Sequence, residues 1–385
     1  MPAQKPLSIG IIGAGIGGLA VAATLRQAGF APTIFEQAKA FARVGAGIQQ
    51  SPNAMKVHRG LGIEDRLRQT SFRPETSLNR DAITGAVTNN HPLGAAVEAK
   101  YGAPYLTLHR GDLHAALLDL VPSDSIALGK KLVSIDQDGD RVHLAFADGR
   151  HAELDAVIGA DGVHSPMRDY VVGPTVARFT GRLAYRTTYP ASRLNIDIGS
   201  SRTKWWGRDR HIVIYFVTAA RDEVYFVTSQ PEAADWMTKE SWSSKGDLDE
   251  LRAAFADFHP DVRAVLAAAP EVHKWGIFER DPLPTWSRGR VVLLGDACHP
   301  MTPYMASGAA MALEDAVVFA RSLAEFGTSH IDEVYKTFEA TRKPRTSTVQ
   351  AGSSANTWMR DATNPDWLYG YDAWKAPLES GLLVA

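Results

Sequence analysis

The sequence predicts a mixed α/β fold in which a domain with a parallel sheet is interrupted by an inserted antiparallel sheet. Three observations favour this class. Residues 7–36 follow the order strand, glycine turn, helix and strand. Two later apolar runs, at 155–160 and 290–295, end where an Asp stands beside a Gly, an arrangement typical of strands that lead into a ligand-binding turn. Residues 211–229 hold two aromatic and β-branched runs around a polar turn, which indicates a hairpin.

Composition limits the possible functions. The chain has 385 residues, 45% hydrophobic and 22% charged, which is enough for one large or two closely joined domains. The formal net charge is -2 and the basic residues form no stripe, which argues against a nucleic-acid partner and favours a small molecule. A single cysteine excludes an internal disulfide and suits a reducing compartment, so we expect a cytoplasmic protein.

The amino-terminal strand, turn and helix predict dinucleotide binding. Gly13, Gly15 and Gly18 form a GxGxxG pattern, and Glu36 ends the second strand. In this Rossmann-type pattern the first glycine permits a tight turn, the second lets a pyrophosphate approach, and the third lets helix and strand pack. The acid can bond a ribose hydroxyl. A glycine-rich packing turn is one alternative. Because the segment 5–25 is apolar with a cationic start, a secretory signal or membrane anchor is another, but the glycine spacing disfavours it and we expect no membrane partner.

Three later segments place polar residues where a ligand could bind. Arg110 sits just before a helix expected within 108–118. Asp161 and Asp296 follow buried strands, at the sheet edge where open α/β folds bind ligands. Each position also has an ordinary interpretation, as a surface arginine at a helix start or a plain turn from strand to helix.

The stretch GDACHPM, residues 295–301, invites a metal or thiol interpretation. Asp296, Cys298 and His299 are nearly consecutive, so they cannot converge on one ion from a strand end without contortion. Cys298 has no clear partner base. We therefore expect no metal and no thiol catalysis.

Four ordered motifs, GAGIGG, HRGDL, GADGVHSPMR and GDACHPMTP, resemble those of the single-component flavoprotein aromatic hydroxylases, the para-hydroxybenzoate hydroxylase class. The resemblance implies bound FAD, NADH or NADPH that docks transiently, and O2 that forms a C4a-hydroperoxide on the flavin. The single dinucleotide fingerprint fits that scheme. The residues that the motifs and the resemblance assign to the cofactor are Gly13, Gly15, Gly18, Glu36, Gln37, Arg43, Gln49, Arg110, Asp161, Asp296, Pro303, Gly308 and Ala309.

A narrower likeness extends from the first strand to the tail and includes RHIVIYF and NPDWLYGYD. It is to the subgroup that acts on pyridine carboxylates of the 6-hydroxynicotinate type. It implies hydroxylation of a hydroxy- or amino-substituted aromatic or pyridine carboxylate, with loss of the carboxyl group. Two family histidines are replaced here, by Gln49 and Tyr304, so the flavin machinery carries over while the substrate does not. Both residues are expected to contact the substrate.

Alternation along RHIVIYFV places His211, Val213 and Tyr215 on one face of a strand. We expect this sheet to cover the flavin ring, with Tyr215 and His211 as catalytic and substrate-binding residues. The alternative is that both are half-buried sheet residues. Lys204 and Arg202 could attract a carboxylate, but a solvated strand end is an equal alternative.

The expected FAD-binding domain is discontinuous, over 1–74, 105–180 and 276–340. The substrate sheet occupies 75–104 and 181–275, and an aromatic, partly helical tail occupies 341–385. Other functions remain open at this stage: a salicylate or 3-hydroxybenzoate hydroxylase, a flavin oxidase or reductase without oxygen insertion, or a flavin sensor without activity. The oligomer is expected to be a monomer or a homodimer.

Overall fold

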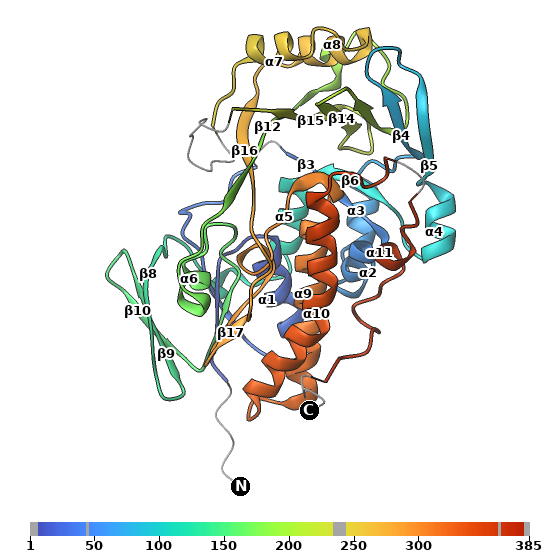
Figure 1. Ribbon diagram of the computed structural model, residues 1–385. Helices are drawn as coiled ribbons and strands as arrows, with labels where there is room; N and C mark the ends of the chain where they lie inside the picture. Colours follow the sequence, from blue (N-terminus) through green and yellow to red (C-terminus); the bar gives the residue numbers. More distant parts are fainter. Residues whose placement is uncertain (1–6, 44–45, 234–243, 361–362, 381–385) are drawn as a thin grey trace.

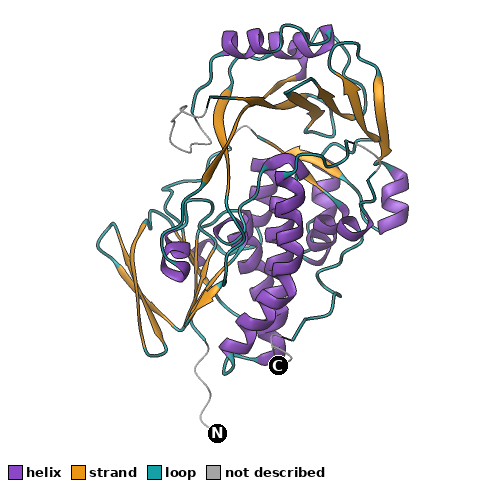
Figure 2. Ribbon diagram, in the orientation of Figure 1, coloured by secondary structure: helices purple, strands orange, loops and turns teal. Residues whose placement is uncertain are grey.

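The computed structural model describes residues 7–43, 46–233, 244–360 and 363–380, and Figures 1 and 2 show a layered mixed α/β molecule. One body is built on a six-stranded sheet with the order β17-β18-β11-β1-β2-β7. Strands β18, β11, β1, β2 and β7 run parallel to one another, and the edge strand β17 is antiparallel to β18. The strands are β1 (Ile9–Ile12), β2 (Thr33–Phe35), β7 (Ile126–Ala127), β11 (Ala156–Gly159), β17 (Ser287–Arg288) and β18 (Val291–Leu293). The predicted Rossmann-type arrangement is confirmed.

Helices cover this sheet because their apolar faces are buried against it. Long helices α9 (Gly308–Phe326) and α10 (Ile331–Ser354) lie side by side, and α9 also packs on α1 (Ile16–Gln27). The first helix ends just before Gly29, whose φ of 89° is a left-handed value suited to glycine. The remaining helices of this body are α2 (Pro52–Gly60), α3 (Glu64–Thr70), α4 (Ala95–Tyr101), α5 (Arg110–Leu118), α6 (Pro166–Val172) and α11 (Asp366–Tyr369).

The second body is a seven-stranded sheet with the order β16-β12-β15-β14-β13-β4-β5. It is antiparallel except where β13 and β4 run parallel, a departure from the wholly antiparallel sheet expected. The expected hairpin is confirmed, with His211 opposite Ser229 and Tyr215 opposite Tyr225. The strands are β4 (Thr76–Asp81), β5 (Val87–Pro92), β12 (Arg178–Pro190), β13 (Arg202–Trp206), β14 (His211–Phe216), β15 (Glu223–Pro231) and β16 (His273–Glu279).

One face of this sheet carries its own hydrophobic core. Helices α7 (Leu248–Ala254) and α8 (Pro260–Ala268) cover that face, as the upper part of Figure 1 shows. Phe255 and Phe258 are buried there among sheet residues such as Ile212 and Phe226, so they are core residues, as expected. The opposite face of the sheet looks toward the first body.

Two smaller sheets complete the fold. One is a three-stranded meander of β8 (Leu132–Asp138), β9 (Arg141–Phe146) and β10 (His151–Leu154). The other pairs β3 (Gly47–Gln50) with β6 (Leu106–His109), antiparallel, between the two bodies. Three elements span the domain boundaries that we expected from the sequence. Strand β12 spans the boundary at 180, β16 the boundary at 276, and α10 the boundary at 340.

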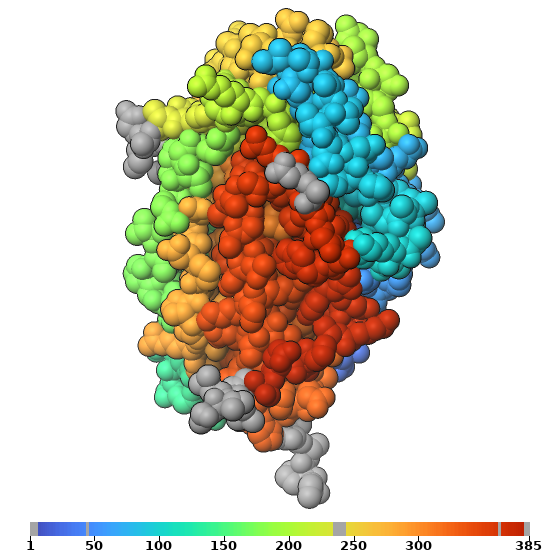
Figure 3. All heavy atoms as spheres, turned by 45° about the vertical axis from the view of Figure 1, so that its right-hand side comes forward, coloured from blue at the N-terminus to red at the C-terminus, as the bar shows by residue number. Residues whose placement is uncertain are grey.

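The C-terminal segment packs on the body of the molecule, where Figure 3 shows it in red. Nζ of Lys56 donates to the carbonyl of Gly370 at 2.9 Å, and Nε1 of Trp374 donates to the carbonyl of Lys56 at 3.2 Å. In the ranges that the structure describes, no helix combines the length and apolar character needed to cross a bilayer.

Candidate active site

The glycine turn between β1 and α1 has the geometry of a phosphate cradle. Gly13 has a φ of 101°, and a Cβ there would lie 2.6 Å from the carbonyl oxygen of Ala160. A Cβ on Gly18 would lie 1.9 Å from the carbonyl oxygen of Gly13. A Cβ on Gly15 would meet nothing within 4 Å, because it would point into open space at the start of α1. The first and third glycines are therefore required by the protein itself, while the second leaves room for a ligand at the helix amino terminus, which no side chain caps.

Two of the other expected cofactor residues at this end are engaged within the protein. The carboxylate of Glu36 accepts from the N–H of Ala14 at 2.7 Å and from that of Ala38 at 2.8 Å, so it is held against the glycine turn. Arg43 makes ion pairs with Asp112 at 3.0 Å and Glu223 at 2.9 Å. The hydrogen bond that Arg43 donates to Asp112 raises the pKa of Arg43. Gln37 is exposed.

A cavity of about 330 Å³ runs from the glycine turn to the inner face of the seven-stranded sheet. Residues from several separate segments line it, since the turns after β1, β11 and β18 meet at one edge of the six-stranded sheet. The expected cofactor or substrate residues among its walls are Gly15, Gln49, Arg110, Tyr215, Asp296, Pro303, Gly308 and Ala309.

Arg110 and Asp296 place opposite charges on the cavity wall. Arg110 is the first residue of α5, and Asp296 lies in the short 3-10 turn Gly295–Ala297. Both residues are exposed by accessible surface because they face the cavity, although protein atoms surround the cavity wall on which they lie. Burial lowers the pKa of Arg110. Burial raises the pKa of Asp296, and electrostatic interactions with its neighbours His299 and Arg110 oppose that rise. The cavity thus offers both an acceptor and a cation to a polar cofactor.

Asp161 does not lie among the described cavity-lining residues, although its neighbours Ala160 and Gly162 do. Its carboxylate accepts from Oγ of Ser165 at 2.5 Å and from the N–H of Met167 at 3.1 Å, which secures the start of α6. Burial raises the pKa of Asp161 to about 6. The structure therefore gives this residue a role in the turn and does not bring its side chain to the cavity.

Gln49 and Tyr215 meet at the end of the cavity nearest the sheet. Oε1 of Gln49 accepts a 2.5 Å hydrogen bond from the hydroxyl of Tyr105, and the Gln49 side chain also hydrogen-bonds the Tyr215 hydroxyl. Tyr215 is 1% exposed, and burial raises its pKa, so it stays a neutral phenol near pH 7. The cavity side of the hairpin thus presents a phenol oriented by an amide.

His211 and Tyr304 lie together, but outside the described lining of the cavity. Their ring centroids are 5.7 Å apart, and the Tyr304 hydroxyl lies 3.0 Å from Oγ of Ser229. His211 is 5% exposed. Burial lowers the pKa of His211 well below its usual value, and the neighbouring charge of Lys204 adds to this, so the ring is neutral.

The sequence analysis missed several sheet residues that line the cavity, among them Arg186, Tyr225 and Trp275. The guanidinium of Arg186 stacks over the Trp275 ring at 4.7 Å, across the β12–β16 pair. For Tyr225 a signal was present, because it pairs with Tyr215 in the predicted hairpin. No local sequence pattern predicts that Arg186 and Trp275 line the cavity. Their orientation depends on the pairing of β12 with β16, some 90 residues apart in the chain.

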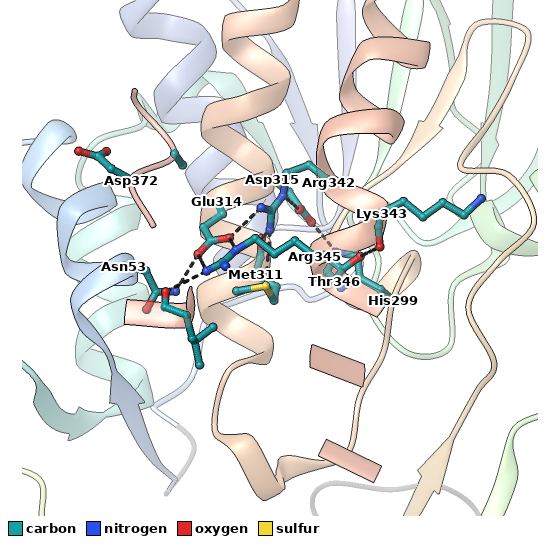
Figure 4. A network of polar contacts seen from close by, with 12 residues as sticks. Asn53, His299, Met311, Glu314, Asp315, Arg342, Lys343, Arg345, Thr346 and Asp372 are labelled. Atoms are coloured by element: carbon teal, nitrogen blue, oxygen red, sulfur yellow. Dashed lines mark hydrogen bonds and ion pairs between the residues drawn. The ribbon is translucent and has the colours of Figure 1, made fainter. Parts of the chain in front are cut away.

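His299 and the buried acidic and basic residues near it form a structural network rather than a metal site (Figure 4). Glu314 and Asp315 are fully buried, and Arg342 contacts both at 2.7 Å. His299 contacts Asp315, and Arg345 contacts Glu314. Over the described ranges, no three His, Cys, Asp or Glu side chains are grouped to hold a metal. Burial raises the pKa of the Cys298 thiol, which disfavours a thiolate nucleophile.

The cradle, the cavity and its polar walls fit a flavin dinucleotide. The open space at Gly15 suits a pyrophosphate, and the small residues Gly308 and Ala309 at the start of α9 leave room for a flat ring. The sheet closes the far end with aromatic side chains.

Comparison with known proteins agrees with this fit. Residues 7–353 match a family model described as an FAD binding domain. The chain is 47% identical to 6-hydroxynicotinate 3-monooxygenase of Bordetella bronchiseptica, over 98% of each chain, and 45% identical to the enzyme of the same name from Pseudomonas fluorescens, over 97% of each. Its fold is similar to Klebsiella pneumoniae HpxO complexed with FAD and uric acid, with a TM-score of 0.80 and 28% identity over 91% of this chain and 87% of that one.

Proposed function

From the premise that the chain belongs to the FAD-binding aromatic hydroxylases and is a flavoprotein monooxygenase, we propose a specific reaction. The protein hydroxylates a hydroxy- or amino-substituted pyridine or benzene carboxylate with loss of the carboxyl group, using NADH or NADPH and O2. The two relatives at 45–47% identity, both named 6-hydroxynicotinate 3-monooxygenases, support a substrate of that type.

The observation that carries the proposal is one continuous cavity. Gly15 and Asp296 line it at the end of the dinucleotide cradle, while Tyr215 and Tyr225 line it at the sheet. Bound FAD would be held by the glycine turn, Arg110, Asp296 and the start of α9, and would supply the oxygen-transfer chemistry. An aromatic ring between the flavin and the sheet would then contact the two tyrosines.

Tyr215 would position the ring through its substituent. Its hydroxyl, oriented by Gln49, can hydrogen-bond a hydroxyl or amino group on the ring. A hydrogen bond donated to a hydroxyl oxygen of the ring stabilises its deprotonated form, and the phenol oxygen can instead accept from a ring amino group; either favours the more electron-rich, more nucleophilic form of the substrate. Gln49 cannot gain or lose a proton near pH 7, so it orients the phenol but does not shuttle protons.

The sheet would also exclude water. Tyr215 and Tyr225 are 1% and 4% exposed, and α7 and α8 cover the opposite face of the sheet. A site shielded from water favours oxygen transfer over wasteful release of peroxide.

The test is NADH and NADPH oxidation by the FAD-loaded protein with a panel of aromatic acids, followed by mass analysis of the products. The panel contains 6-hydroxynicotinate, 4-hydroxybenzoate, 4-aminobenzoate, salicylate and 3-hydroxybenzoate. We expect a product that gains one oxygen and loses the carboxyl group. Oxygen gained with the carboxyl group kept would contradict the decarboxylation. Nucleotide oxidation that yields only peroxide with every ring would contradict the substrate class.

A further inference from the structure

Strand β13 brings a group of cations to the inner face of the seven-stranded sheet. Lys204 pairs with Val213, and Trp206 pairs with His211, so Arg202, Lys204 and Trp206 share a face with His211 and Tyr215. Arg202 is 8% exposed, Lys204 3%. The interpretation of these two residues as a solvated strand end is therefore wrong.

Among the described residues, the contacts of these cations are with neutral groups. Nη1 of Arg202 donates to Oγ of Ser77 at 2.7 Å. Nζ of Lys204 lies 3.7 Å from the ring centroid of Trp206, and the guanidinium of Arg360 lies 5.2 Å from the same ring.

Arg182 is a further cation whose charge lowers the pKa of Lys204. Its guanidinium donates to the hydroxyl and carbonyl of Ser229 and to the carbonyl of Asp209. The carboxylate of Asp209 forms an ion pair with Arg210 at 2.8 Å. Within the ranges the structure describes, no carboxylate makes an ion pair with Lys204, Arg202 or Arg182.

Two hydrogen-bond donors in this group are buried without an acceptor among the described atoms: Nε of Arg202 and Nε1 of Trp206. Burial and the charges of Arg202, Arg182 and Arg360 all lower the pKa of Lys204. An unpaired buried cation is costly, and unfilled donors add to the cost. A bound anion would offset both, so the arrangement fits an anion better than it fits an empty core.

We propose that Lys204, with Arg202 beside it, binds the carboxylate of the aromatic substrate, while His211 and Trp206 flank that carboxylate. This rests on the proposed function and adds the location of the carboxylate. Thr203 pairs with Ile214 across β13 and β14, so the same register continued by one residue brings Arg202 opposite Tyr215. Cβ atoms of residues that face each other in this way are about 5 Å apart. A ring that contacts the Tyr215 hydroxyl can therefore direct its carboxylate to these donors.

The experiment is a titration of the FAD-loaded protein, followed by the change in flavin absorbance, with 6-hydroxynicotinate and its uncharged amide. The variants are Lys204→Met, Lys204→Arg and, as a control, Lys274→Met. Lys274 is a lysine of the same sheet that pairs with Glu250 and contacts Tyr185 in the outer core.

We expect the wild type to prefer the acid. The Lys204→Met protein should bind the acid roughly tenfold to 100-fold more weakly, as expected for a lost charged hydrogen bond, with unchanged affinity for the amide. Lys204→Arg should keep part of the preference, and Lys274→Met all of it.

Equal binding of acid and amide by the wild type, or an undiminished preference in Lys204→Met, overturns the proposal. So does a Lys204-dependent absorbance change given by inorganic phosphate but not by the ring acid, because the site would then serve a free anion. The titration needs no turnover. If the protein bound acid and amide equally and transferred oxygen to a ring without a carboxylate, the proposed carboxylate site would be contradicted, but the monooxygenase reaction would not.

Discussion

Nε2 of His299 lies 2.6 Å from Oδ2 of Asp315, and the same carboxylate oxygen accepts the N–H of Gly295 at 3.1 Å. These two contacts join the turn after β18 to the helix α9. Because Asp296 stands between Gly295 and His299, its direction into the cavity is set by this buried junction.

Replacing Arg342 by Met should destabilise the protein strongly. Arg342 neutralises both Glu314 and Asp315, all three being 0% exposed, so its removal leaves buried carboxylates with less compensation. Breaking such a pair from one side costs about 3–5 kcal/mol. Chemical denaturation of the FAD-loaded protein measures the effect. Arg66→Ala, which breaks an exposed pair with Asp119, is the control and should change little. Equal stability of the two variants would contradict this account of the network.

Alanine at Gly15 and at Gly18 should fail in different ways. The Gly18 Cβ collides with the Gly13 carbonyl, so Gly18→Ala should lower the melting temperature of the FAD-free protein. The Gly15 Cβ meets no protein atom, and the residue has a φ of -73°, so Gly15→Ala should melt normally without FAD. It should nevertheless bind FAD weakly, because the methyl group occupies the space of the pyrophosphate. Thermal melting with and without FAD separates the two effects. A Gly15→Ala protein that binds FAD normally would show that the cradle holds something else.

Tyr215→Phe should slow product formation by roughly 100-fold, the lower range for a positioned proton-transfer or hydrogen-bonding group. It removes the hydroxyl that Gln49 orients while keeping the ring. Single-turnover product analysis is the measurement. Tyr189→Phe is the matched control, because Tyr189 lies in the outer core of the same sheet and donates at 2.7 Å to the carbonyl of Val265. If both variants formed product equally fast, Tyr215 would be a packing residue.

Asp161→Asn should become relatively more stable as the pH rises from about 4 to about 7. In the folded protein the pKa of Asp161 is about 6, above its usual value, so the folded state keeps a proton that the unfolded chain has already lost. Wild-type stability from this group is thus present at low pH and declines as pH rises through that window. Asparagine cannot ionise and escapes the decline. The melting temperatures of the two proteins across this range test the sign, and a constant difference would contradict it.

Local patterns predicted the parts of the fold that depend on neighbouring residues. The glycine spacing predicted β1, α1 and β2, and the alternation along β14 predicted which face carries His211 and Tyr215. The same patterns placed Asp296 at the carboxyl end of a buried strand, and the cavity lies there.

Other features depend on distant partners and could not be predicted. Asp161 and Asp296 follow equivalent strands of the sheet. The carboxylate of Asp161 accepts a hydrogen bond from Ser165 at the start of α6, whereas Asp296 faces the cavity. The role of Glu314 and Asp315 depends on Arg342, which lies on the next helix and reveals its partners only when α9 and α10 pack together. The burial of Lys204 likewise depends on the sheet being closed against the first body.

The two faces of strand β14 separate two kinds of change. Ile212, Ile214 and Phe216 pack into the core beneath α7 and α8, whereas His211, Val213 and Tyr215 face the flavin-binding body. Mutations at the even positions would register mainly as lost stability, and mutations at the odd positions mainly as altered ring preference. A lineage could therefore exchange one aromatic substrate for another by altering every second residue of a few strands, while the oxygen chemistry continued unchanged on the other side of the cavity.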